Sequence, residues 1–236
     1  MLNMSTIEGS NQGAITIAER VFDSLCNAIV KGEIPAGSKI SEPELAKHFV
    51  VSRASLRDAI GRLEACNLVI RRPNVGARVV ALSDQELLEI YAVREALEGM
   101  AARQAAEQMS DAELDELQTL LDKEVSASSN DNNNDFHYAI VKGSKNNRLK
   151  RLLCDDLYHL MRMYRFQLGR QGGRASSASK EHGLIMDALR DRDGEMAELL
   201  MRRHIRMSRR HIEISLRSGG QFKINPAATK SQKLFL

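Results

Sequence analysis

The sequence predicts a mainly α-helical protein of two domains: a small N-terminal domain with one β-hairpin, and an all-α bundle of about six helices. Three observations support this. Two short helical segments and a hairpin follow one another between residues 41 and 81. No strand-like alternation of apolar and polar residues occurs after residue 81. The 236 residues are also enough for two domains of ordinary size.

The stretch Ser41–Leu63 carries the two short helices. Ser41 and Glu44 have the S-x-x-E spacing of a capping box, with Pro43 tolerated in the first turn. The first helix is therefore predicted to begin here and to end near Phe49.

Ser52 is predicted to cap the second helix, which leaves Arg53 and Arg57, one turn apart, on a single face. The opposite, buried face consists of three apolar residues at helical spacing, Leu56, Ile60 and Leu63. Two short helices, a tight turn and an arginine-bearing face are typical of a helix-turn-helix whose second helix enters the major groove of DNA.

A hairpin is predicted directly after this pair, with strands at residues 68–72 and 77–81 and a turn at Pro73–Gly76 whose glycine can take a positive φ. Upstream, Ile17–Val30 has helical apolar spacing and is predicted to pack behind the two short helices. Residues 14–81 are therefore predicted to form a winged helix-turn-helix DNA-binding domain, with the hairpin as its wing.

Four segments of this domain resemble the winged-helix signature of the GntR family of bacterial transcription regulators: Gly32–Glu42, Glu44–Ala46, Val51–Ala59 and Arg62–Ala65. In that family the arginines matching Arg53 and Arg57 contact guanines or nearby phosphates, and the wing tip reaches the minor groove. The resemblance implies a double-stranded DNA operator as partner. The residues it implies for DNA binding are Ser52, Arg53, Ser55, Arg57, Arg62, Asn74 and Gly76.

The sequence departs from that signature at two positions. Pro43 stands where many relatives carry a basic residue, and Gly61 stands where a longer side chain is common. The first departure removes one DNA contact, so the operator is expected to differ from the commonest one.

Composition restricts the class of protein. The net charge is only +3, so DNA binding must depend on local placement of charge and not on a basic tail. Cys26, Cys66 and Cys154 are odd in number and form no C-x-x-C pair, which indicates reduced, buried thiols in a cytoplasmic protein. No apolar run approaches the roughly 18–20 residues of a membrane span, and Met1–Gly13 is polar, so neither a membrane partner nor a signal peptide is expected.

The second domain is predicted to span residues 83–217, with flexible tails at residues 1–13 and 218–236. Two further capping boxes, Ser83–Glu86 and Ser110–Glu113, open its first two helices. The helices are predicted at residues 83–109, 110–124, 136–141, 147–168, 180–189 and 194–216, with loops at 126–134 and 169–179.

Histidines are the candidate metal ligands of this domain. Asn133 and His137 are four residues apart, so they lie on one face if the helix already includes Asn133. His182 and His204 flank a tight turn between the last two helices, so their imidazoles can face one another if those helices are antiparallel. Three imidazoles and one oxygen ligand suit a divalent transition metal, zinc first and nickel or manganese as alternatives. The spacing alone is weak support, because a single helical histidine is more often structural.

Four segments of the bundle resemble the FCD effector-binding domain of the FadR subfamily of GntR regulators: Asn133–His137, Gly143–Asn146, Glu181–Ala188 and Ala197–His204. Metal-binding members of that domain use an Asp or Asn, a His four residues later, and one His on each of the last two helices. The resemblance therefore implies the ligands Asn133, His137, His182 and His204. Asp is commoner than Asn at the first position, and Asp135 is an alternative oxygen ligand.

In the resembled family a small carboxylate effector fills the open metal positions, and arginines neutralise its charge. Arg94 and Arg165 are the candidates here, and the alternative for both is an interhelical ion pair. The implied protein is a homodimer that binds an inverted repeat and in which the effector changes the placement of the two recognition helices.

Three alternatives stay open: a structural metal, a metal-free effector pocket, and a metal-dependent hydrolase. The hydrolase is disfavoured because the H-E-x-x-H pattern is absent. Glu181, next to His182 in sequence, is predicted to point elsewhere on its helix.

Overall fold

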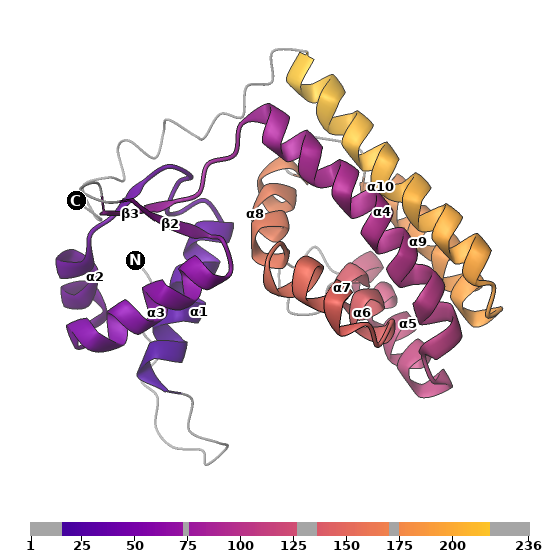
Figure 1. The fold of residues 1–236 in the computed structure, drawn as a ribbon, viewed down its shortest axis with the longest axis horizontal. Coiled ribbons are helices and arrows are strands. Elements are labelled where there is room, and N and C mark those ends of the chain that lie inside the picture. Colours follow the sequence, from indigo (N-terminus) through magenta and orange to yellow (C-terminus); the bar gives the residue numbers. More distant parts are fainter. Residues whose placement is uncertain (1–15, 73–75, 127–135, 170–174, 218–236) are drawn as a thin grey trace.

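The computed structural model describes residues 16–72, 76–126, 136–169 and 175–217, which form an N-terminal unit with a small sheet and a C-terminal helical bundle (Figure 1). The predicted wing tip with Asn74, the oxygen ligands Asn133 and Asp135, and the two tails lie outside the described residues. No helix in these ranges combines the length and the apolar composition of a membrane span.

The N-terminal unit is a winged helix-turn-helix. Its sheet is antiparallel with strand order β1-β3-β2, and the β2–β3 pair confirms the predicted hairpin. Strand β1 was not predicted, because two residues are too few to show the alternation of a strand. The elements are α1 (Ile17–Val30), β1 (Lys39–Ile40), α2 (Glu42–Phe49), α3 (Arg53–Ala65), β2 (Val69–Arg72) and β3 (Gly76–Val79).

Helix α2 begins after Ser41 as predicted, but the predicted capping box is wrong, because the Ser41 side chain makes no capping hydrogen bond. The backbone of Ser41 has φ −95° and ψ 101°, whereas Ser52, which does cap its helix, has φ −64° and ψ 150°. Ser41 directly follows β1, whose pairing with β3 holds the chain in this direction. Tertiary pairing has therefore overridden a local capping signal.

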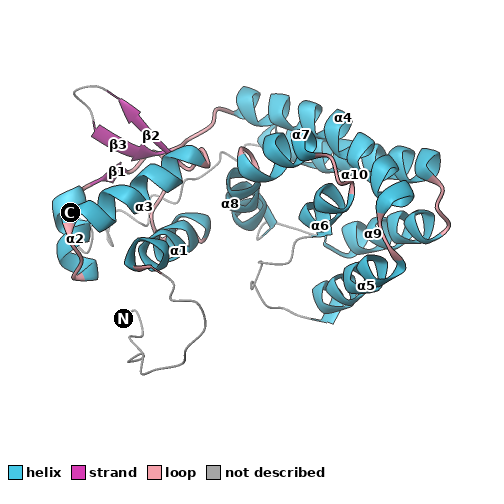
Figure 2. Cartoon of the chain, turned by 60° about the horizontal axis from the view of Figure 1, so that its bottom comes forward, coloured by secondary structure: helices cyan, strands magenta, loops and turns pink. Residues whose placement is uncertain are grey.

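The C-terminal unit is the predicted all-helical bundle. Helices α4 and α10 lie side by side in opposite directions, and α9 packs next to α10 (Figures 1 and 2). The two long helices approach closely at Gly99, where a Cβ atom would lie 2.5 Å from Cγ of Arg202. The helices are α4 (Asp84–Gln108), α5 (Asp111–Ser126), α6 (Phe136–Gly143), α7 (Asn147–Lys150), α8 (Tyr158–Gly169), α9 (Ala175–Arg190) and α10 (Gly194–Arg217).

Two helix predictions in the bundle need correction. The single helix predicted at residues 147–168 is divided into α7, a π-helical turn at Arg151–Asp155 and α8. The apolar residues Leu149, Leu153, Leu157 and Leu160 keep helical spacing across this turn, so the sequence does not reveal it. Helix α9 begins at Ala175, inside the predicted loop. Its first residues are small or carry hydroxyls, so no apolar stripe marks this start in the sequence. The three cysteines are free and buried, as predicted.

Candidate functional site

The recognition helix α3 is held in place by its cap and its buried face. The Ser52 side chain accepts a hydrogen bond from the Ser55 backbone N–H at 3.0 Å, and the two hydroxyls lie 2.9 Å apart. The buried face contains four apolar residues without solvent exposure, Leu56, Ala59, Ile60 and Leu63. Ser52 and Ser55 thus form the start of the helix, and Arg53 is exposed beside them.

Arg57 is exposed but paired. Its Nε donates to Oε2 of Glu42 at 2.9 Å, and the other oxygen of this carboxylate lies 3.8 Å from Nη1 of Arg71. Glu42, at the first position of α2, therefore connects the recognition helix to the wing. Sequence reasoning did not single out Glu42.

Gly76 and Arg62 are the remaining DNA-binding candidates among the described residues, and they lie on different elements. Gly76, at the start of β3, has φ +83° as predicted. Arg62 turns toward α1, where its Nη2 lies 3.4 Å from Oε1 of Glu19 and its guanidinium lies 5.1 Å from the ring centre of Phe22.

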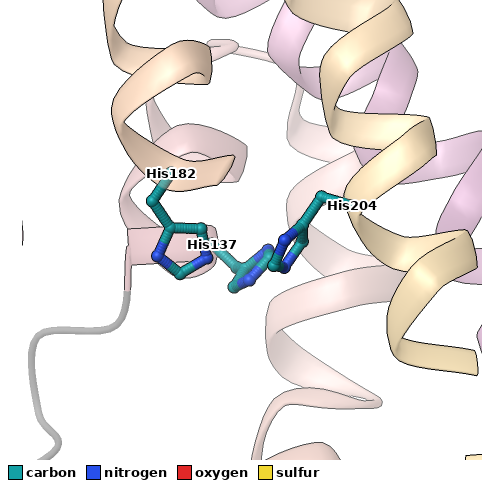
Figure 3. A group of neighbouring side chains, drawn as sticks. All are labelled: His137, His182 and His204. Atoms are coloured by element: carbon teal, nitrogen blue, oxygen red, sulfur yellow. The ribbon is translucent and has the colours of Figure 1, made fainter. Parts of the chain in front are cut away.

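Three histidines from three helices meet inside the bundle (Figure 3). His137 comes from α6, His182 from α9 and His204 from α10, and their side chains converge with ring centres 4.7–5.2 Å apart. One nitrogen from each lies within 4.8 Å of the others, and the three residues are 8, 7 and 4 % exposed. This arrangement of imidazoles can hold a transition-metal ion.

Two glutamates brace the cluster. Nδ1 of His137 donates to Oε2 of Glu98 at 2.7 Å, and Nδ1 of His204 donates to Oε2 of Glu181 at 2.7 Å. A carboxylate on one ring nitrogen fixes the tautomer and leaves Nε2 as the ligand atom, as is usual around metal sites. The prediction that Glu181 points away from the site is wrong, because its side chain crosses from α9 to α10.

The buried carboxylate of Glu98 lies between Arg94 and His137. Burial by itself raises the pKa of Glu98, but the neighbouring Arg94 and His137 outweigh it and hold that pKa well below its usual range. Nε of Arg94 donates to Oε1 of Glu98 at 2.6 Å. For His204, burial is the main cause that lowers the pKa to about 3, so the imidazole is neutral at pH 7, as metal ligation requires.

Arg94 therefore makes an ion pair within α4, and not the interhelical pair considered as its alternative role. It also borders a cavity of about 30 Å³ beside His137, whose other walls are mostly apolar. The side chain of Arg165 lies outside the described part of the chain. The spacing Arg94-x-x-x-Glu98 is the one sequence signal that could have identified Glu98.

A winged helix with an arginine-bearing recognition helix, followed by a separate helical domain, defines a DNA-binding transcription regulator and not an enzyme. The chain belongs to the GntR family of bacterial regulatory proteins: residues 17–79 match the family described as "Bacterial regulatory proteins, gntR family", and residues 89–207 match the FCD domain.

Relatives extend over most of the chain. An uncharacterized HTH-type transcriptional regulator, YdhC, of Bacillus subtilis is 28% identical over 208 residues, which cover 84% of this chain and 92% of that protein. A probable D-xylose utilization operon transcriptional repressor of Paenarthrobacter nicotinovorans is 29% identical over 202 residues, 80% of this chain and 86% of its own. The solved structure of E. coli McbR/YncC shares the fold, with a TM-score of 0.71 at 22% identity, and covers 86% of this chain and 100% of its own.

Proposed function

We propose that the protein binds an inverted-repeat operator as a homodimer and responds to a small carboxylate effector anchored at a divalent metal in the C-terminal domain. The observation that supports this proposal is the buried histidine triad, in which Glu98 and Glu181 each accept a hydrogen bond from one of the rings. Three imidazoles suit zinc, and also nickel or manganese.

DNA binding is assigned to the exposed face of α3. Arg53 and Arg57 are one turn apart on this face and are the candidates for base readout. The candidates for contacts to the phosphate backbone of DNA are Ser52, Ser55, Asn74 and the wing around Gly76. Arg62 is the weakest candidate, because its guanidinium already lies against Glu19 and Phe22.

Exposed apolar side chains on the bundle support the homodimer. Val93 and Met100 lie two turns apart on α4, and both are nearly half exposed. A second set lies along one side of α10, namely Leu199, Met207 and Ile214. Exposed apolar residues grouped in this way are typical of a protein–protein interface.

The effector site is assigned to the region where the triad meets Arg94. When bound, the metal supplies a Lewis-acidic anchor for a carboxylate. The chain itself fixes the ligand nitrogens through Glu98 and Glu181, and excludes water by burying all three rings. Asn133 or Asp135 is the proposed oxygen ligand, and Arg165 a further effector contact.

A structural metal without an exchangeable position is the second candidate. The cavity of about 30 Å³ beside His137 favours it, because this cavity is too small for an organic acid as it stands.

The test compares metal content and carboxylate binding. We expect about one metal per chain in the purified protein, lost in a His137→Ala/His182→Ala variant together with the heat of binding of a carboxylic acid. His211→Ala is the matched control, since His211 is exposed on α10. Metal that is retained while no acid binds would establish the structural alternative, and no metal in either protein would remove the metal from the proposal.

A further inference from the structure

Two cavities of very different size lie on either side of one wall. The small cavity beside His137 measures about 30 Å³, and a cleft of about 510 Å³ separates the winged helix from the bundle. Three residues line both, namely Tyr138, Cys154 and Tyr158. In both views α8, which begins with Tyr158, is the helix of the bundle nearest the winged helix (Figures 1 and 2).

The small cavity cannot take an organic acid without moving a wall, because its volume suits about two water molecules. One side is formed by the buried ion pair of Arg94 and Glu98, which is tied to His137. Packed interiors yield little, so a wall moves most readily toward empty space. Tyr138, Cys154 and Tyr158 form the wall between the small cavity and the cleft, so this wall has empty space behind it.

The chain at this wall is irregular. Cys154 belongs to the π-helical turn Arg151–Asp155, and a bend separates this turn from α8. Short π-helical segments are frequent at functional sites.

The same segment contacts the winged helix directly. Nδ2 of Asn67, just after α3, donates to the backbone oxygen of Asp156 at 3.0 Å. Nδ1 of His159 lies 3.3 Å from Sγ of Cys26 on α1, and its ring meets that of Phe22 edge-on at 5.9 Å. A movement of the turn therefore reaches both α1 and the end of the recognition helix.

We propose that the wall of Tyr138, Cys154 and Tyr158 couples the two domains. A carboxylate that binds at the effector site beside His137 displaces this wall into the cleft and thereby shifts the winged helix. This coupling rests on the effector site proposed above. By reciprocity, anything that fills the cleft beforehand opposes binding of the acid.

A single tryptophan tests the displacement, because the chain contains none. Phe22→Trp places the probe in the cleft, and Phe49→Trp on α2 is the control outside it. The zinc-loaded variants are titrated with acetate, lactate, malonate and citrate, and binding is followed in parallel by calorimetry. For an acid that binds, we expect a blue shift of the Phe22→Trp emission and an unchanged Phe49→Trp emission.

A second variant fills the cleft. Ala65→Leu, at the end of α3, should weaken binding of the same acid about tenfold, roughly 1.4 kcal/mol, and leave the zinc content unchanged; Ala92→Leu, exposed on α4, should leave both unchanged. An acid that binds without the blue shift and with equal affinity in Ala65→Leu overturns the coupling alone. Calorimetry without heat for all four acids overturns the effector site, and the coupling with it.

Discussion

Nδ1 of His137 lies 2.7 Å from Oε2 of Glu98, and this contact joins the histidine triad to the first helix of the bundle. Glu98 comes from α4, whereas the three histidines come from α6, α9 and α10. The Glu98 carboxylate on α4 thus orients the imidazole of His137, which belongs to α6.

Loss of this contact should weaken metal binding. We expect Glu98→Gln to lower zinc affinity about 10- to 100-fold, because an oriented and more basic imidazole is lost. Glu181→Gln should have a smaller effect, since Glu181 is the more exposed of the two carboxylates. Competition with a chromogenic chelator measures both affinities. Glu89→Gln, exposed on α4, is the control, and an affinity of Glu98→Gln equal to that of the control would contradict the prediction.

The Arg94–Glu98 pair should matter for stability. Removing one member of a buried ion pair leaves the other charge unpaired, so Arg94→Ala should lower the free energy of unfolding by about 3–5 kcal/mol. The exposed Arg103, on the same helix, pairs at the surface with Glu107 and Glu198, and Arg103→Ala should cost at most about 1 kcal/mol. Urea unfolding followed by circular dichroism checks the difference. Equal midpoints for the two variants would show that the buried pair adds nothing.

The two arginines of the recognition helix should differ in DNA binding. Arg53→Ala should weaken binding to an operator by about 1–3 kcal/mol and reduce the salt dependence. Arg57→Ala should cost less, by up to about 1 kcal/mol, because Arg57 must first leave Glu42. Fluorescence anisotropy at several salt concentrations with the protein's own promoter DNA measures both. A larger loss for Arg57→Ala would mean that Glu42 positions this arginine for DNA instead of competing for it.

The turn between α2 and α3 contains a strained residue. Val50 has φ +53° and ψ +47°, a left-handed conformation that is unfavourable for a β-branched side chain, and it is 85 % exposed. Val50→Gly should therefore raise the stability of the winged helix by about 1 kcal/mol, because the strain disappears and no buried contact is lost. Differential scanning calorimetry would show a melting temperature higher by a few degrees. Val51→Gly, at a position that packs on the core, should lower it instead.

The domain interface should weaken in acid. Burial, followed by the charge of Arg162, lowers the pKa of His159 to about 4, and its Nδ1 lies 3.3 Å from Sγ of Cys26. An unfolded histidine titrates near pH 6.5, so between about pH 6.5 and 4 the unfolded chain binds more protons than the folded one. The contribution of a neutral His159 is thus complete above about pH 6.5 and is lost as the pH falls toward 4.

His159→Gln should accordingly lose less thermal stability than the wild type between pH 7.5 and pH 5. Melting curves at both pH values measure this, with His211→Gln as the exposed control. An identical drop in the wild type and in His159→Gln would show that this imidazole does not titrate differently on folding.

Local patterns were sufficient for most of the fold. The stripe of Leu56, Ile60 and Leu63 predicted the buried face of the recognition helix, and the pairing of β2 with β3 confirmed the wing. Capping boxes at Ser83 and Ser110 marked the starts of α4 and α5, since a capping signal acts within four residues. The π turn after α7 could not be predicted, because its apolar spacing is also that of a regular helix.

The sequence by itself determined which residue types are available: three histidines on helical segments, arginines on the recognition helix, and a glycine in the wing. Only the tertiary structure decided which of them meet. It brought Glu98 and Glu181 to His137 and His204 and held Arg57 against Glu42. Such contacts join residues up to 39 positions apart, so they depend on how helices pack and not on any periodicity within one helix.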